Sequence, residues 1–431
     1  MLLPMLQKPF FGWIRPRFEY EILPPRLPEP GQIAASKTVT LYHPKSDKQN
    51  MPALFRLGDK VNTGQKISLF ANDPAYVIAT ATGRISSISP FTGDFGKSYL
   101  AVTINIAGNE IFDNEFETVV QNPTLEGAID FLSYAPGKPP LSLFSDPQHD
   151  IKTIVINGVD SDLLVGTNQY IVKSKINKLK SGIQLLKTIT GIENIVMTVA
   201  GESLQGYGHL GAEVKAVDTA YPSALPRLIM KNALGQIVPA GQSCEDLGVC
   251  FFSAEAIAAM GTAFDTGRIP ITKIITLIRK DGSQKLIEAT IGTPIEDIFA
   301  THGITVNEKD RIIFGGPMRG LAVYSLEHAV QPDTDAIMVL DQSQAAYASD
   351  YPCINCGECV RTCPAKIQVN LLVRFLEAGQ YEEAADNYDL YSCVECGLCS
   401  FVCVSKIPIF QYIKLGKYEL ERAKPSEGTN G

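Results

Sequence analysis

The sequence contains two cysteine runs that repeat one another forty residues apart near its C-terminal end. "CINCGECVRTCPAKI" begins at Cys353 and "CVECGLCSFVCVSKI" begins at Cys393, and both have the spacing C-x2-C-x2-C-x3-C. Three thiolates spaced this closely can hold three corners of an iron–sulfur cubane, whereas structural zinc sites usually combine two separated C-x2-C pairs. The spacing therefore predicts two [4Fe–4S] clusters, and it constrains the C-terminal fold more than any other feature.

The fourth cysteine of each run is expected to ligate the cluster of the other run, as in two-cluster ferredoxins. Pro364 follows Cys363 as that pattern requires, whereas Val404 follows Cys403 where a proline is expected. This departure changes the turn but removes no ligand. The predicted ligands are Cys353, Cys356, Cys359 and Cys403 for cluster 1, and Cys393, Cys396, Cys399 and Cys363 for cluster 2.

Length and composition exclude several other classes. A chain of 431 residues predicts about three domains, and a net charge of -8 leaves no basic footprint for nucleic acid. No apolar stretch of about 18 residues is present, so we expect no membrane span, and the start of the chain predicts no signal peptide. The cysteine usage fits a reducing compartment. Cys244 and Cys250 lie far from the two runs in sequence and are predicted to be buried thiols.

The N-terminal quarter is predicted to be an arm followed by a β module. Residues 1–36 are proline-rich and predict an extended arm lying on the rest of the protein. Residues 37–110 contain short alternating strands between glycine turns. Within them, "GDKVNTGQKI" and "TATGRISSI" resemble the hammerhead of biotinyl and lipoyl domains. Because Lys66 lies in a strand-like stretch rather than at a hairpin tip, we predict a structural β module and not a carrier.

The middle of the chain changes its periodicity twice. Residues 120–268 alternate apolar strands such as "IKTIVING" and "NIVMTVA" with amphipathic helices, which predicts a parallel sheet with crossover helices. Residues 269–335 return to β-structure, with a hairpin turning at Asp281-Gly282. The next helix is predicted to start with Thr293 as N-cap and to end at Gly303. A hairpin, a short helix and a further strand indicate a small β-grasp domain.

Details of the capping prediction depend on three neighbouring residues. With Thr293 as N-cap, Pro294 takes the first helical position and Glu296 closes a capping box.

The C-terminal part of the chain, residues 345–423, is predicted to be helical around the two cysteine runs. Residues 424–431 are predicted to be disordered.

In this order the segments resemble the C subunit of the Rnf-type ion-translocating electron-transport complex. The resemblance covers nearly the whole chain and is most specific at "GGPMRG" (315–320) and at the two cysteine runs. It implies a hammerhead-like β module, an α/β domain like that of the flavin-binding subunit of respiratory complex I, a β-grasp domain and an α-helical two-cluster ferredoxin module. It also implies membrane partners and a coupled ion.

The sequence departs from that family where the family binds flavin. The glycine-rich loop position holds "FLSYAPGKPPLSLFSD", the stretch after the first strand is "NGVDSDLLVGTNQY", and the segment "AYPSALPRL" keeps only Tyr221 and Pro222 of the family pattern. Prolines remove the N–H donors that a flavin phosphate needs. We therefore expect no FMN, predict that the FMN and NADH site has been lost, and name no cofactor-binding or catalytic residue.

Other nucleotide or metal motifs are weak. "GYGHLG" (206–211) fits G-x-G-x-x-G, but the segment after it resembles a strand rather than a helix, and no acidic residue follows about 20 positions later. We interpret it as a surface loop. The five histidines are scattered, and only His209, within this loop, merits a test.

The sequence as a whole predicts an iron–sulfur electron-transfer subunit of an Rnf-like membrane-bound oxidoreductase complex. It would lie peripherally on the cytoplasmic face of the inner membrane and pass electrons between a soluble donor, such as a ferredoxin, and membrane subunits. Two alternatives stay open. One is an NADH-oxidising flavin/iron–sulfur subunit with an unusual FMN loop, and the other is a soluble iron–sulfur scaffold protein. Donor, acceptor, direction of electron flow and coupled ion do not follow from the sequence.

Overall fold

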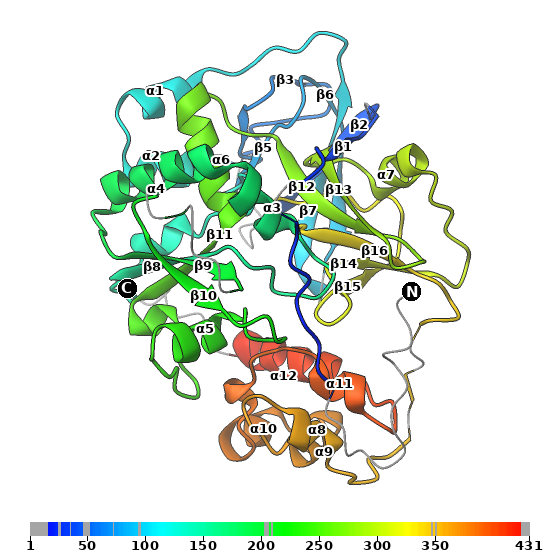
Figure 1. The fold of residues 1–431 in the computed structure, drawn as a ribbon. Coiled ribbons are helices and arrows are strands. Elements are labelled where there is room, and N and C mark those ends of the chain that lie inside the picture. The colour runs from blue at the N-terminus through cyan, green and yellow to red at the C-terminus, as the bar shows by residue number, and fades with distance from the viewer. Residues whose placement is uncertain are drawn as a thin grey trace.

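The computed structural model describes most of the chain. It covers residues 16–24, 27–34, 36–45, 52–71, 73–93, 96–201, 207, 210–345, 348–349 and 351–423. The predicted tail 424–431, the first 15 residues of the predicted arm and residues 206, 208 and 209 of the loop 206–211 lie outside the described residues. The described part is mixed α/β, with three larger sheets, one small sheet and a C-terminal group of helices (Figure 1).

The first sheet is antiparallel and has the strand order β2-β7-β6-β3. Its apolar residues alternate along the strands and form a core that includes Val39, Leu41, Val102 and Ile104. A two-stranded sheet, β4 with β5, lies beside it, and Lys66 falls within β4 as predicted. The bounds are β2 Thr38–Pro44, β3 Lys60–Val61, β4 Lys66–Ile67, β5 Val77–Ile78, β6 Gly83–Thr92 and β7 Ser98–Ile106.

The second sheet is fully parallel, with the order β10-β9-β8-β11, which confirms the predicted α/β alternation. Its central strands are apolar and buried, as parallel strands between covering layers usually are. The strands are β8 Thr153–Asn157, β9 Ile195–Ala200, β10 Glu213–Val217 and β11 Val249–Ser253. The helices are α1 Glu115–Gln121, α2 Leu125–Leu132, α3 Thr167–Ser174, α4 Ile176–Thr190, α5 Pro226–Ala233 and α6 Ala254–Thr266.

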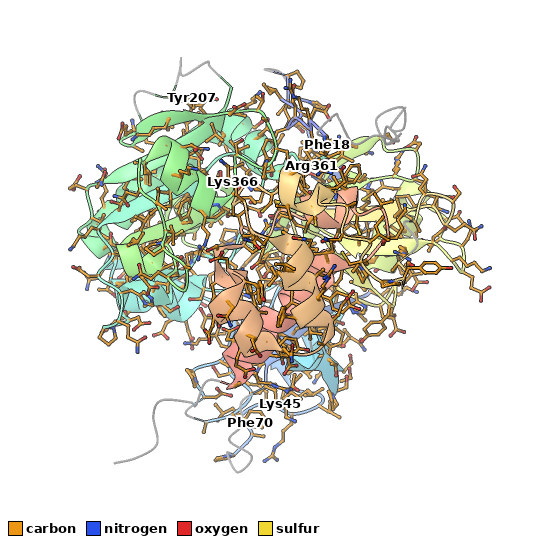
Figure 2. All side chains as sticks on the ribbon, turned by 90° about the horizontal axis from the view of Figure 1, so that it is seen from below. Phe18, Lys45, Phe70, Tyr207, Arg361 and Lys366 are labelled. Atoms are coloured by element: carbon orange, nitrogen blue, oxygen red, sulfur yellow. The ribbon has the colours of Figure 1, made fainter. Side chains whose placement is uncertain are left out.

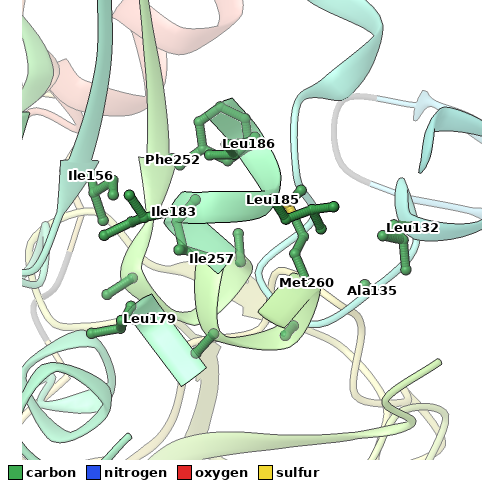
Figure 3. Packing of buried hydrophobic residues seen from close by; sticks show 14 of the residues in the cluster. Leu132, Ala135, Ile156, Leu179, Ile183, Leu185, Leu186, Phe252, Ile257 and Met260 are labelled. Atoms are coloured by element: carbon green, nitrogen blue, oxygen red, sulfur yellow. The ribbon is translucent and has the colours of Figure 1, made fainter. Parts of the chain in front are cut away.

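Helices α4 and α6 cross closely above this sheet. Ile183 and Leu186 of α4 pack with Ile257 and Met260 of α6 and with Phe252 of β11 (Figure 3). The close crossing depends on glycine, because a Cβ atom at Gly182 would lie 2.0 Å from the backbone oxygen of Ile257. This pair of helices anchors the α/β unit.

The third sheet has six strands in the order β1-β13-β12-β16-β14-β15. β12 and β13 form the hairpin predicted at Asp281-Gly282, while β1 comes from the N-terminal segment and pairs in parallel with β13. Because β16 follows residue 335, the sheet extends past the predicted end of this unit. The bounds are β1 Gly31–Gln32, β12 Thr272–Ile278, β13 Gln284–Thr290, β14 Arg311–Phe314, β15 Leu321–Val323 and β16 Ala336–Leu340.

The helix of this unit, α7 Ile295–His302, starts differently from the prediction. Pro294 is its N-cap residue, with extended backbone, and no side chain caps the first turn. The predicted capping box of Thr293 and Glu296 is therefore wrong. Thr293 is buried, and the two N–H groups that a capping box would use have other acceptors: Glu296 N donates to Leu326 O and Thr293 N to Thr290 O, each at 3.1 Å. The helix ends at Gly303 with a left-handed backbone, as predicted.

The C-terminal helices form a separate layer at the bottom of the molecule in Figure 1. Their apolar side chains pack together with six of the eight run cysteines. The module is thus built around the sulfur atoms rather than beside them. Its helices are α8 Glu358–Thr362, α9 Val369–Glu377, α10 Tyr381–Asn387, α11 Leu398–Val402 and α12 Ile409–Ala423.

Buried polar contacts fix the units relative to one another. The Nζ atom of Lys273 on β12 lies 2.8 Å from a carboxylate oxygen of Glu255 on α6, and these side chains are 0% and 4% exposed. The N-terminal segment runs down to the C-terminal layer, where Phe18 makes an edge-to-face contact with Phe401 (Figure 1). None of the described helices combines the length and apolar character needed to cross a bilayer.

Candidate metal centre

The two cysteine runs adopt the same backbone. In each, the residue before the second cysteine and the glycine after it are left-handed: Asn355 and Gly357 have φ of 59° and 73°, and Glu395 and Gly397 have 56° and 72°. Successive turns of this kind point backbone N–H groups into one concavity, which suits an anionic cluster. The short helices α8 and α11 begin directly after these glycines.

Each of the two cysteine cavities is lined by cysteines from both runs. The structure brings the cysteines together in two small cavities, each with three cysteines of one run and the fourth of the other. Apolar side chains complete both linings. The first cavity holds Cys353, Cys356, Cys359 and Cys403, and the second holds Cys393, Cys396, Cys399 and Cys363. In the described part of the chain, no three His, Cys, Asp or Glu side chains are arranged to bind a single metal ion.

Hydrogen bonds and burial act on these sulfur atoms. The backbone N–H of Glu395 donates to Cys393 Sγ and that of Ile407 to Cys403 Sγ, each at 3.4 Å. Burial raises the pKa of the Cys359 and Cys396 thiols to about 12. These thiols are neutral in the metal-free protein at neutral pH, so metal binding must displace their protons.

The second cavity lies against the α/β unit. The hydroxyl of Tyr221 donates to the backbone oxygen of Cys396 at 2.6 Å. Cys396 and Leu398 share one apolar cluster with Tyr221 and Leu163. The chain thus buries this side of the C-terminal module under residues that lie more than 170 positions earlier.

The loop "GGPMRG" (315–320) connects the six-stranded sheet to the same cavity. Arg319 Nε donates to the backbone oxygen of Glu395 at 3.0 Å. Asp162 holds the loop from the other side, because its carboxylate accepts the N–H groups of Met318 at 3.1 Å and of Arg319 at 2.7 Å. Sequence reasoning noted the loop as a family feature but missed Asp162, because the stretch "NGVDSDLLVGTNQY" was interpreted only as a departure from the family pattern.

Asp162 is almost fully buried. Burial raises the pKa of its carboxyl to about 6, although hydrogen bonds from Arg319, Leu163 and Met318 oppose the shift. The carboxylate is therefore ionised at neutral pH and binds the loop through charge-assisted hydrogen bonds.

The first cavity, by contrast, reaches the surface. Cys356 is exposed, and three large apolar side chains in the same stretches face solvent: Tyr351, Ile354 and Val404 are 76%, 63% and 53% exposed. Figure 2 looks at this layer from below, with Arg361 labelled on it. The exposed side chains named here are therefore mainly apolar, and Arg361 adds one positive charge.

The segment expected to replace the flavin loop packs as a structural connection. The backbone of Gly137 lies against the first turn of α6, where an added Cβ would be 2.4 Å from Ala256 N. The hydroxyl of Ser253 already accepts the N–H of Ala256. Ala135 and Leu141 are fully buried. The helix N-terminus that could bind a phosphate is thus covered and capped.

A larger cavity, of about 560 Å³, lies between this segment, the first sheet and the six-stranded sheet. Aromatic side chains line it, with Tyr42 and Phe91 stacked at 4.0 Å and His328 edge-on to Phe91 at 5.2 Å. Lys138 and Asp333 form an exposed ion pair in its lining. No sequence pattern indicated this cavity, because its walls come from four separate stretches.

The remaining candidates of the sequence analysis are not part of a metal site. Cys244 and Cys250 are buried, as predicted, and burial raises the pKa of the Cys244 thiol to about 11. They lie in two different apolar clusters. His209 is outside the described residues.

Comparisons with known proteins agree with this geometry. Residues 352–408 match the family described as "4Fe-4S dicluster domain". Over 291 residues, 65% of this chain, the sequence is 29% identical to the C subunit of the ion-translocating oxidoreductase complex of Pseudomonas aeruginosa. It is 23% identical over 78% of its length to the C subunit of the Na(+)-translocating ferredoxin:NAD(+) oxidoreductase complex of Acetobacterium woodii.

The chain is thus similar to C subunits of such complexes over most of its length. The matched part spans 38% of the length of the Pseudomonas protein and 80% of that of the Acetobacterium protein. Among solved structures, an NAD+-reducing [NiFe]-hydrogenase in the H2-reduced state is similar with a TM-score of 0.46 and 13% identity, over 71% of this chain and 63% of that chain.

Proposed function

We propose that this chain is the C subunit of an ion-translocating oxidoreductase complex and relays electrons there through two [4Fe–4S] clusters. The observation that carries the proposal is the pair of cysteine cavities, each lined by three cysteines of one run and the fourth of the other. Cluster 1 would be held by Cys353, Cys356, Cys359 and Cys403, and cluster 2 by Cys393, Cys396, Cys399 and Cys363.

When bound, each cluster would accept and release one electron. The residues of the chain then hold the cluster, exclude water from it and adjust its charge balance. Backbone N–H groups aimed at Cys393 and Cys403 sulfur stabilise the more negative state. Apolar side chains of α9 and α12 close the cavities on the inner side.

We propose further that electrons cross the protein surface at cluster 1. Cys356 is exposed, and the exposed apolar side chains of Tyr351, Ile354 and Val404 lie within two residues of cluster 1 cysteines in the sequence, where a redox partner could cover them. Cluster 2 would be the inner centre, since Cys396 and Cys399 are buried. The partners would be membrane subunits of the complex and a soluble donor such as a ferredoxin, with the chain bound peripherally at the cytoplasmic face.

Substitution Ile354→Glu is expected to slow electron exchange with the partner at least about tenfold, because a charge in a small apolar contact costs about 1.4 kcal/mol or more of binding. The measurement is stopped-flow reduction of the clusters by reduced ferredoxin at several concentrations. Ile237→Glu is the matched control, since Ile237 is 74% exposed and outside the cysteine layer. Equal rates for both variants and the unmodified protein would show that the partner docks elsewhere.

The finer domain assignment is also a proposal. The antiparallel sheet supports a hammerhead-like module at 37–110, the parallel sheet supports a flavin-subunit-like α/β domain at 120–268, and the six-stranded sheet supports a β-grasp domain. The β-grasp unit would run from 269 to about 340, because β16 belongs to its sheet. Limited proteolysis followed by mass spectrometry tests these boundaries.

We propose that the chain binds neither FMN nor NADH. Support comes from Gly137 and Ser253, which cover and cap the N-terminus of α6, and from the buried side chains of the replaced loop. The alternative, an NADH-oxidising flavoprotein with an unusual FMN loop, is favoured by the aromatic cavity of about 560 Å³, which has the volume of a small-molecule site.

Cofactor analysis decides between these two functions. Protein isolated anaerobically is expected to contain about eight irons and eight acid-labile sulfides per chain and no acid-extractable flavin. NADH added to it should leave the iron–sulfur absorbance unchanged. Stoichiometric flavin, or bleaching by NADH, would establish the alternative, and one zinc without sulfide would contradict both.

A soluble iron–sulfur scaffold is the third hypothesis. Tagged protein from solubilised membranes should carry membrane subunits with it, and alkaline carbonate should release the chain from membranes without detergent. Recovery only from the soluble fraction, without membrane subunits, favours the scaffold.

A further inference from the structure

The loop that carries the second run's first two cysteines has its backbone oxygens tied to donors from elsewhere in the chain. Lys417 Nζ donates to Cys393 O at 3.1 Å, Arg319 Nε to Glu395 O at 3.0 Å, and the Tyr221 hydroxyl to Cys396 O at 2.6 Å. Two of the three donors are cations. All three carbonyls are therefore turned toward donors outside the loop.

The position of Arg319 is closely fixed. Its own N–H donates to the buried Asp162, and a Cβ at Gly316 would lie 2.6 Å from the Asp162 carboxyl carbon. On the cluster side, a Cβ at Gly397 would lie 2.2 Å from Met318 O. The "GGPMRG" loop is thus packed closely between Asp162 on one side and the cysteine loop on the other. Asp162 is a positioning residue for Arg319.

The corresponding loop of the first run has a weaker arrangement. Arg361 donates to Cys356 O at 2.9 Å, but its side chain is 50% exposed and also forms an ion pair with Glu358. Asn355, which corresponds to Glu395, binds Asn370 and carries no charge. Water and the Glu358 carboxylate screen the charge of Arg361.

We propose that Arg319, positioned by Asp162, raises the reduction potential of cluster 2 independently of cluster 1. The inference rests on the proposed function. One-electron reduction, with the electron supplied by the redox partner, adds one negative charge to the cluster. A partly buried cation such as Arg319 stabilises that added charge more strongly than an exposed cation such as Arg361.

The test is a redox titration of anaerobically purified full-length protein with dithionite, followed by low-temperature electron paramagnetic resonance. Arg319→Gln is expected to lower the midpoint potential of one cluster signal by about 59 mV, a tenfold change in its one-electron reduction constant. The other signal should stay in place. Arg319→Lys, which keeps the charge, should shift by less than half as much.

Two further variants separate charge from structure. Arg361→Gln should lower only the midpoint potential of cluster 1, and by a smaller amount, because that guanidinium is exposed. Glu395→Gln should raise the midpoint potential of cluster 2, since it removes a negative charge that pairs with Lys417 at 2.7 Å. A purely structural role for the loop would not give shifts of opposite sign.

Iron analysis comes first and keeps the two proposals apart. If the unmodified protein holds no clusters, the proposed function fails. If it holds about eight irons and Arg319→Gln moves neither signal, or moves both equally, this inference is overturned. Should Arg319→Gln lose its iron, Glu395→Gln carries the test, and the absence of an upward shift overturns the inference.

Discussion

Replacing Cys363 by alanine is expected to remove cluster 2 and to lower the iron content from about eight to about four atoms per chain. Cys363 follows helix α8 of the first run, yet it lines the cavity of Cys393, Cys396 and Cys399. The first cavity keeps all four of its cysteines in this variant. The loss should therefore appear in the cluster of the other run.

Electron paramagnetic resonance of reduced protein checks this expectation. The Cys363→Ala spectrum should match that of Cys396→Ala, and the Cys403→Ala spectrum should match that of Cys356→Ala. Cys250→Ala is a control, because Cys250 is buried in the α/β unit and should leave both signals intact. If Cys363→Ala resembled Cys356→Ala instead, each run would bind its own cluster and the exchange of fourth cysteines would be wrong.

Removing both clusters is expected to unfold the C-terminal helices while the three sheets stay folded. Helices α8 and α11 have five residues each, too few to be stable without tertiary support. Their packing partners include cluster cysteines such as Cys359 and Cys399, which in the metal-free state become neutral thiols around a void. The module thus loses the centre of its core.

Hydrogen exchange with mass spectrometry measures the size of this effect. After oxidation and chelation of iron, amides of α9 and α12 should exchange at least about 100-fold faster, equivalent to about 2.8 kcal/mol of lost local stability. Amides of β8, β9 and α6 should keep their protection, since Ile154, Met197 and Ile257 are fully buried in a separate core. Unchanged exchange in α9 and α12 would mean that the helices fold without the clusters.

Features carried by short stretches could be predicted from the sequence. The turn at Asp281-Gly282, the parallel strands "IKTIVING" and "NIVMTVA", and the end of α7 at Gly303 depend on residues within a few positions of each other. The strand that contains Lys66 was predictable for the same reason. Local hydrophobic periodicity and turn chemistry are sufficient for such elements.

Features that depend on distant stretches were missed or wrong. The capping box at Thr293 does not form because Leu326 O, about 30 positions away, accepts the N–H of Glu296 that the Thr293 side chain was predicted to bind. The six-stranded sheet extends beyond the predicted unit, since its edge strand β1 and inner strand β16 come from outside it. The aromatic cavity could not be predicted either, because residues from separate stretches of the chain line it.

The candidate site shows the same division. The spacing of eight cysteines by itself determined which kind of metal centre is plausible, because cluster ligands must lie close together along the chain. Only the tertiary structure decided which side of the module is buried and which is open. Tyr221 contacts Cys396 across 175 positions, and Arg319 contacts Glu395 across 76. Asp162 acts on the cysteine loop only through Arg319. No local sequence pattern encodes such contacts. The charge and the solvent access at a cluster depend on those tertiary contacts. The spacing of the cysteines in the sequence therefore determined the ligands, whereas the packing of distant segments determined what surrounds them.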